Sequence, residues 1–377
     1  MSDLVPVGAH GRIVHNADGS RSLIRPWYIG PSDKARYVKH LEYVDLVNER
    51  AASGGDLTKP EATDAVKNAW LLCQNNPAFL AHEYADIGLL EGGTRRFDAW
   101  TPGQRQLYRQ IQIQRAAGQP VRCIILKARR EGVSTLCELL AFWRTAFFER
   151  ANALIAAHEE EAATTCFEMF KLFYERLPAS LQPQVERFNE DEIVFDNPKV
   201  GGRRSDPGLG SRIRTRTVAL GGGTKEKQGK GRSQTIPFLH PTEAAFWAEP
   251  QKFWGGVAHC VADVAETFIL MESTANGFGW FADQWFDAAK GWELVRNHER
   301  GTNEWVCTNP RLSRSDMVPV FLSWLAEPRY SRAFEAEDDR AAFGRDLDPD
   351  ERMLAEGFGA TLEQLHWRRR MLFGTKI

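Results

Sequence analysis

The segment from Cys123 to Leu136 joins an apolar run to a short basic turn and then to a helical pattern. A phosphate-binding loop needs backbone N–H groups at a helix N-terminus, a cation and a hydroxyl that can bind Mg²⁺. Gly132, Ser134 and either Lys127 or Arg129 could supply these groups. The chemistry that this spacing suggests is therefore the binding of a nucleotide through its phosphates.

This loop is irregular as a motif. The usual first glycine is missing, and Val133 stands where a lysine normally precedes the Ser or Thr. Taken alone, the segment is either a variant phosphate-binding loop or a coincidence. Two later segments bear on that choice.

The first of these segments runs from Thr235 to Trp247 and contains an apolar strand that leads to Glu243. ATPases place a carboxylate at the end of such a strand, where it orients the attacking water. The alternative is a buried strand with a solvated Glu at its tip. Coming after a phosphate loop, the segment favours Glu243 as the catalytic carboxylate, whereas a lone histidine such as His240 is more often structural.

The second segment runs from Phe268 to Gly277 and is an apolar strand followed by small and hydroxylic residues. Ligands of open α/β sheets bind at the carboxyl ends of the strands. Ser273, Thr274 and Asn276 are therefore candidates for sensing the γ-phosphate. The alternative is an ordinary turn, because Asn-Gly is a common turn dipeptide.

The elements that must position these residues alternate between strands and helices. We predict strands at 121–126, 153–157, 236–239 and 267–271, and helices at 104–116, after Gly132 and through Phe167 to Tyr174. Such alternation predicts an α/β fold with a mostly parallel sheet and helices on both faces. Segments 192–196 and 213–220 predict an extra β-hairpin, and good helix caps at Asp348 and Thr361 predict C-terminal helices.

Composition narrows the class of protein. The chain has 377 residues, of which 43% are hydrophobic, so it can build a large core, and its formal net charge of −2 gives no global attraction to nucleic acid. Six scattered cysteines without a Cys-x-x-Cys pair fit neither a zinc site nor a disulfide framework. The sequence lacks a signal-peptide pattern and a run of about 20 apolar residues. We expect a cytosolic protein that does not cross a membrane.

A local basic stretch lies between Arg203 and Arg232. It holds nine Lys or Arg residues against the two acids Asp206 and Glu226. Contact with DNA phosphates or with a neighbouring subunit's nucleotide is one interpretation, and a solvated hairpin is the other. Arg232 is the candidate for a phosphate contact between subunits.

The three motifs together resemble the large terminase subunit of tailed bacteriophages, the motor that packages DNA into a procapsid. The resemblance extends from about Asn76 to the C-terminus. It rests on an ordered set of segments: "NPAFLAHEY", "FDAWTPGQRQLY", "IILKARREGVST", "FLHPTEAAFW", "ESTANGFGWFADQW" and "LEQLHWRRRML". The order of the whole set is more specific than any one segment.

The resemblance implies roles for individual residues. It implies that Lys127 replaces the lysine missing at Val133, that Arg129 contacts the γ-phosphate and that Gln104 helps to recognise adenine. The expected ligands are ATP and Mg²⁺, with Ser134 on the metal, Glu243 catalytic, and Ser273, Thr274 and Asn276 in coupling. The remaining ATP-binding candidates lie in and beside the loop: Arg130, Gly132 and Thr135.

One departure from the family concerns the metal. The acidic pair expected at the end of the second motif appears here as Thr242-Glu243. The metal-supporting carboxylate of that pair is therefore missing, and we expect Ser134 and water molecules to coordinate the cation.

The resemblance also implies an organisation and partners. We expect an accessory helical region at 1–75, a P-loop ATPase core at 76–299 and a C-terminal lid at 300–377, without the RNase H-like nuclease domain of the family. The implied partners are double-stranded DNA, the portal protein, the small terminase subunit and further copies in a ring, although the chain could be a monomer in solution. The implied location is the host cytoplasm and, transiently, the procapsid.

Two other functions stay open at this point. The chain could be another P-loop translocase or helicase-like ATPase, although no second phosphate loop follows Met271. It could also be an inactive P-loop protein of a virus particle, a possibility raised by Val133 and Thr242.

Overall fold

The structure is a computed structural model. It describes residues 12–15, 21–24, 26, 28–53, 56–89, 91–198, 208–218, 235–297, 302–309 and 316–373. Arg232 and most of the basic stretch lie outside these residues.

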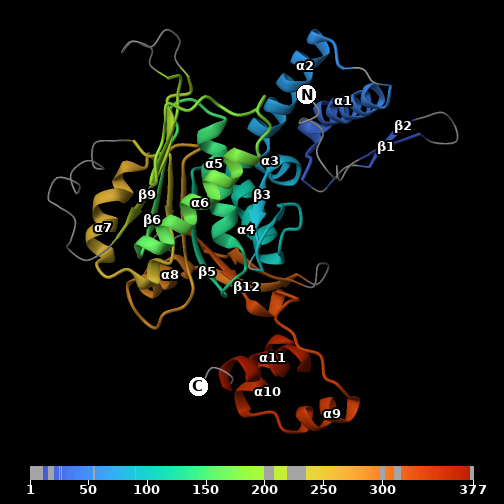
Figure 1. Ribbon diagram of the computed structural model, residues 1–377. Helices are drawn as coiled ribbons and strands as arrows, with labels where there is room; N and C mark the ends of the chain where they lie inside the picture. Colours follow the sequence, from blue (N-terminus) through green and yellow to red (C-terminus); the bar gives the residue numbers. More distant parts are fainter. Residues whose placement is uncertain are drawn as a thin grey trace.

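A single large sheet forms the centre of the described chain (Figure 1). Its eight strands lie in the order β14-β5-β11-β10-β6-β9-β8-β7. The first six are parallel to their neighbours, and β8 and β7 continue the sheet in antiparallel pairs. The strands are β5 (Val121–Lys127), β6 (Asn152–Ala157), β7 (Arg187–Phe188), β8 (Glu192–Phe195), β9 (Ser211–Thr217), β10 (Phe238–Pro241), β11 (Phe268–Ser273) and β14 (Val318–Leu322).

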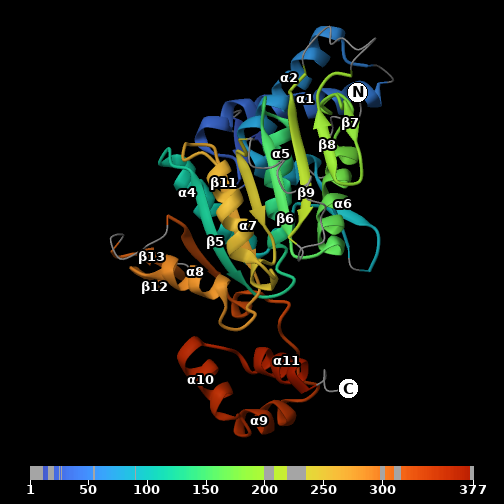
Figure 2. The same ribbon diagram turned by 90° about the vertical axis from the view of Figure 1, so that its left-hand side faces the viewer.

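Helices cover both faces of this sheet (Figure 1 and Figure 2). One face carries α4 (Pro102–Ala116), α5 (Val133–Ala146) and α6 (Glu160–Arg176), and the other carries α7 (Pro250–Val257) and α8 (Trp280–Ala289). Because strand side chains alternate between faces, Ile125 of β5 packs in the cluster with α5, whereas Ile124 packs in the cluster with α8. The predicted mostly parallel α/β fold is confirmed.

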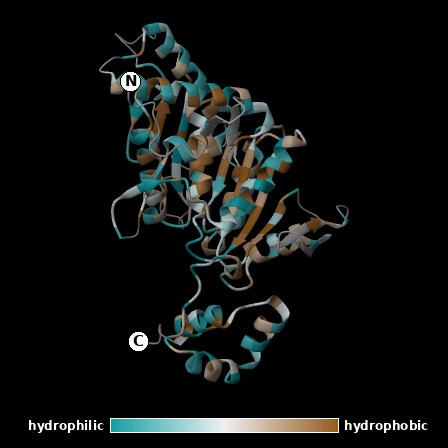
Figure 3. Ribbon diagram, turned by 90° about the vertical axis from the view of Figure 1, so that its right-hand side faces the viewer, coloured by the Kyte–Doolittle hydropathy of each residue, from teal (hydrophilic) through white to brown (hydrophobic). Residues whose placement is uncertain are grey.

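The apolar runs of the sequence form the buried strands. Figure 3 shows the hydrophobic residues gathered along the central strands, with more hydrophilic residues over the C-terminal helices. The pairing of β8 with β9 matches the predicted hairpin, but β9 also pairs with β6, so both strands are part of the main sheet.

The N-terminal part holds α1 (Lys34–Ala52), α2 (Lys59–Asn75) and α3 (Pro77–Tyr84). Tyr37, Leu72 and Phe79 from these helices are buried in the same apolar cluster as α5. Two small hairpins accompany them, β1 (Arg12–His15) with β2 (Arg21–Ile24) and β3 (Asp86–Gly88) with β4 (Thr94–Arg96). The first hairpin lies within the region 1–75, which we predicted to be helical.

After α8, the hairpin of β12 (Trp292–Asn297) and β13 (Thr302–Cys307) precedes β14. The sheet thus takes β14 from the segment that we predicted as a lid. The helices α9 (Glu337–Arg345), α10 (Pro349–Phe358) and α11 (Leu362–Phe373) then form a lobe at one end of the molecule (Figure 1). The predicted caps are present, since Asp348 Oδ1 accepts from the Glu351 N–H and Thr361 Oγ1 accepts from the Gln364 N–H.

Short 3₁₀ helices complete the fold at Pro31–Asp33, Ala244–Phe246, Ala258–Cys260 and Trp324–Ala326. The described part of the chain contains no helix with the length and hydrophobicity needed to cross a membrane.

Candidate nucleotide and metal site

The phosphate-loop candidate is a turn between the end of β5 and the start of α5. Lys127 is the last residue of β5, and Val133 is the first residue of α5. Gly132 caps the helix with φ of +71°, a left-handed conformation that favours glycine. The free N–H groups of the first turn of α5 therefore face the turn, as an anion-binding loop requires.

Val133 explains why the loop has no lysine at its usual position. Its side chain is buried, with 1% exposure, in the apolar cluster under α5. A residue there faces the core, so the cation must come from elsewhere. Lys127, at the front of the loop, is the cation that the structure places in the site.

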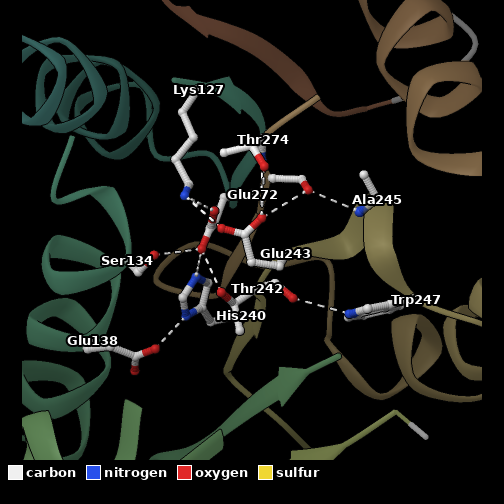
Figure 4. Close-up of polar contacts among 11 residues, drawn as sticks. Lys127, Ser134, Glu138, His240, Thr242, Glu243, Ala245, Trp247, Glu272 and Thr274 are labelled. Atoms are coloured by element: carbon white, nitrogen blue, oxygen red, sulfur yellow. Dashed lines mark hydrogen bonds and ion pairs between the residues drawn. The ribbon is translucent and has the colours of Figure 1, made fainter. Parts of the chain in front are cut away.

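Lys127 lies between two carboxylates (Figure 4). Its Nζ is 3.0 Å from Glu243 Oε1 and 3.0 Å from Glu272 Oε2. Burial would lower the pKa of Lys127, but Glu272 and Glu243 outweigh that effect and raise it, so the ammonium stays charged. The site is thus a buried cation that two anions share.

Glu272 is the main residue of the site that the sequence interpretation missed. It comes from β11, is fully buried, and its Oε1 accepts hydrogen bonds from Ser134 Oγ at 2.8 Å and from Thr242 Oγ1 at 2.6 Å. Burial would raise the pKa of Glu272, but Lys127 and the hydrogen-bond donors outweigh it and hold the pKa below its ordinary value. The available signal was an acidic residue near the end of an otherwise apolar strand.

Behind Glu272 lies a second buried pair. His240 Nδ1 is 2.8 Å from Glu138 Oε1, and His240 Nε2 is 3.6 Å from Glu272 Oε1. Glu138 belongs to α5 and His240 to β10, so the pair ties the loop helix to the neighbouring strand. His240 is fully buried and bonded to Glu138, a position in keeping with the structural role that the sequence favoured.

Glu243 lies just after β10 in a left-handed conformation with φ of +48°. A non-glycine residue in the left-handed conformation has a steric cost. Residues strained in this way are concentrated at functional sites. Its Oε2 accepts from the backbone N–H and the hydroxyl of Thr274, each at 3.3 Å, and from Ser273 Oγ at 3.4 Å. The candidate coupling residues therefore hold the candidate catalytic carboxylate directly.

Ser273 also accepts a hydrogen bond from the Ala245 N–H, and Asn276 Nδ2 donates to the Ala245 carbonyl at 3.2 Å. The end of β11 is in this way connected twice to the turn that carries Glu243. A shift of one of these segments would move the other.

Gln104 approaches the loop from α4. Its Nε2 donates to the Gly132 carbonyl at 2.7 Å, and its Oε1 accepts from the Thr101 N–H. A Cβ at Gly132 would lie 2.5 Å from Gln104 Nε2, a second reason for glycine at this position. Gln104 therefore shapes the loop, and its role in adenine recognition stays a prediction.

The remaining predicted residues have weaker links to this cluster. Arg129 and Arg130 are exposed at the turn, and Arg130 has φ of +57°. Thr135 is partly buried in the first turn of α5. Their roles in binding stay predictions.

The donor set fits a nucleotide-bound Mg²⁺. Mg²⁺ takes oxygen ligands and keeps waters and phosphate oxygens in its shell. Ser134 Oγ and the carboxylates of Glu272 and Glu243 are all oxygen donors. The described residues contain no group of three or more His, Cys, Asp or Glu that could hold a metal ion by themselves.

Sheet, loop and carboxylates together are the parts of a P-loop nucleotide-binding fold. No protein-family model matches the chain, and no curated protein does. Among solved structures, the matches include the large terminase ATPase domain of Thermus phage P74-26, at 17% identity over 64% of this chain and 90% of that one, with a TM-score of 0.39.

The large terminase of bacteriophage HK97 matches at 14% identity over 77% of this chain and 54% of that one, with a TM-score of 0.43. A large terminase from a thermophilic bacteriophage in complex with ADP matches at 11% identity over 66% of this chain and 50% of that one, with a TM-score of 0.35. The chain thus spans about half the length of these two terminases.

Proposed function

We propose that the chain is an ATP-hydrolysing motor of the large terminase type, which moves double-stranded DNA into a viral procapsid. The observation that carries the proposal is the cluster in which Lys127 lies between Glu243 and Glu272 at the phosphate loop. The ordered sequence motifs support the choice of the terminase family among P-loop ATPases.

In this proposal, the N–H groups around Gly132 and the ammonium of Lys127 hold the ATP phosphates, with Arg129 and Arg130 at the rim of the loop. Ser134 would provide a hydroxyl ligand for Mg²⁺, which would neutralise phosphate charge when bound. Glu243 accepts a proton from water as the water oxygen bonds to the γ-phosphorus and the bond to the ADP oxygen breaks.

Loss of the γ-phosphate must then be coupled to movement of the DNA. Thr274 and Ser273 bond Glu243 directly, so a change at the γ-phosphate alters the contacts at the end of β11. We propose that this link drives DNA movement, in a ring of copies docked on the portal protein and supplied with DNA by the small terminase subunit. Arg232 remains the candidate for a contact across subunits.

Glu243→Gln tests the chemical step. The variant keeps the size of the side chain but removes the base, so hydrolysis should fall by about 100-fold or more, while the Kd for a fluorescent ATP analogue stays within about threefold. Glu249→Gln is the matched control, because Glu249 is exposed and pairs with Lys252 outside the site. Turnover of Glu243→Gln at the wild-type rate would contradict the assignment.

A triplex-displacement assay tests movement on DNA. We expect the wild-type chain to displace a third strand from duplex DNA with ATP, and Glu243→Gln not to do so. Separation of a forked duplex would favour a helicase-like ATPase instead. Absence of nucleotide binding at millimolar concentration would favour the inactive structural protein.

A further inference from the structure

The turn after β10 has one carboxylate where a motor ATPase of the proposed type needs two. Thr242 occupies the position of the metal-supporting acid and is buried, with 4% exposure. A threonine hydroxyl is neutral and this one donates to Glu272, so Thr242 offers a cation no negative charge. The sequence alone leaves this charge missing.

The neighbouring strand β11 supplies a carboxylate in place of the missing one. β11 lies between β5 and β10 in the sheet, and Glu272 is in register with Ile125 of β5, two residues before Lys127. From there its carboxylate reaches both Ser134 Oγ and Thr242 Oγ1 (Figure 4). A carboxylate that contacts the loop hydroxyl and the end of β10 is therefore present, although a different strand supplies it.

We propose that Glu272 is the metal-supporting carboxylate of this site, in the place of the acid that Thr242 replaces. The inference rests on the proposed ATPase function. Glu272 and Ser134 hold the nucleotide-bound cation, and Thr242 orients the carboxylate. Glu243 is then left free to act as the base.

The charge balance of the buried cluster supports this role. A fully buried carboxylate is costly unless it is paired. Lys127 provides positive charge for both Glu272 and Glu243, and the ring of His240 lies 3.6 Å from the other oxygen of Glu272. When phosphates bind, the ammonium turns toward them, and a divalent cation beside Ser134 takes over the neutralisation of Glu272.

A structural role is the alternative, in which Glu272 only ties Ser134 to Thr242. Metal binding separates the two roles, because a glutamine retains an acceptor oxygen for these hydroxyls but lacks the charge. The measurements are the affinity of a fluorescent ATP analogue with and without Mg²⁺, and the affinity of Mn²⁺ for the nucleotide complex by electron paramagnetic resonance.

For Glu272→Gln, we expect nucleotide affinity without metal to stay within about threefold and Mn²⁺ affinity to fall about 10-fold or more. The double variant Glu272→Gln, Thr242→Asp, which returns a carboxylate to the turn after β10, should recover most of the loss. Glu351→Gln is the matched control, since Glu351 is similarly buried but pairs with Arg369 in the C-terminal lobe, away from the site.

Unchanged Mn²⁺ affinity in a folded Glu272→Gln variant would overturn the inference while leaving the proposed function intact. If that variant does not fold, Glu272→Asp, which keeps the charge on a shorter side chain, should weaken Mn²⁺ binding, and an unchanged value would again overturn it. If the wild-type chain binds no nucleotide under either condition, the proposed function itself fails.

Discussion

At the scale of single residues, Glu131 is a further buried carboxyl and lies within the loop itself. Its side chain is 2% exposed, and neither of its oxygens has a hydrogen-bond partner among the described residues. Burial and the nearby Glu327 raise the pKa of Glu131 to about 8, against the opposing effect of Lys127 and Arg329. Glu131 is therefore protonated in the folded protein at pH values where the unfolded chain is ionised.

This difference predicts a pH dependence of stability. Between about pH 4.5 and 8 the folded state holds one more proton than the unfolded state, so the free energy of unfolding falls as pH rises, by up to about 1.4 kcal/mol per pH unit. Glu131→Gln should remove this contribution and be more stable than the wild type at pH 8. Urea unfolding at pH 6 and pH 8 measures both values, and equal pH slopes for the two proteins would contradict the prediction.

The residues of the site differ in how far the sequence could predict them. Lys127, Ser134 and Glu243 lie in or next to recognisable motifs, and the structure brings them into one cluster through Glu272. Glu272 could not be assigned, because its role depends on β11 lying beside β5, and strand order is a tertiary property. Val133 shows the same limit, since only packing reveals that its position faces the core.

At the scale of elements, the strands β5, β6, β10 and β11 were predicted within a few residues. Each is a short apolar run followed by a helix or turn, and parallel strands buried on both faces give that signal. The hairpin of β1 and β2 was not predicted, because its short polar strands carry no periodic signal.

The turn from β5 to α5 depends on glycine for two separate reasons. Gly132 has φ of +71°, and a side chain there would meet the Gln104 amide. Gly132→Ala should therefore lose about 1–2 kcal/mol of stability through backbone strain and also disturb the bond from Gln104 to the loop carbonyl. Because the proposed function places the ATP phosphates on this loop, we expect weaker binding of an ATP analogue in a calorimetric titration.

Gly255→Ala is the control for that change. Gly255 lies in α7, and a Cβ there meets nothing within 4 Å, so alanine should stabilise the helix slightly. If Gly132→Ala bound nucleotide as well as Gly255→Ala does, the loop would not be the phosphate site.

At the scale of the whole molecule, the lobe of α9, α10 and α11 joins the sheet through residues 323–336 (Figure 1). This linker touches the phosphate loop, since Arg329 Nη2 donates to the Arg130 carbonyl at 3.2 Å and Arg329 pairs with Glu327. A change in the loop on nucleotide binding could thus be passed to the lobe through the backbone of Arg130.

Trp367 holds the lobe on this linker. Its ring stacks on Tyr330 with centroids 4.5 Å apart and on Trp324 with centroids 5.8 Å apart. Trp367→Ala should remove both contacts at a cost of about 2 kcal/mol, borne by the lobe rather than by the sheet. Amide hydrogen exchange should accelerate in α11 and in residues 323–336, whereas α5 keeps its protection.

A control variant and a measurement of nucleotide affinity show whether Trp367→Ala loosens only the lobe or the whole protein. Phe358→Ala removes an aromatic ring that is 54% exposed on α10, so it should change exchange little. Nucleotide affinity of Trp367→Ala should stay within about threefold of the wild-type value, because Lys127, Glu243 and Glu272 are anchored in the sheet and the linker reaches the loop through the Arg329 bond to the Arg130 carbonyl. Loss of protection in α5 together with α11 would show instead that lobe and sheet unfold as one unit, which would contradict the prediction.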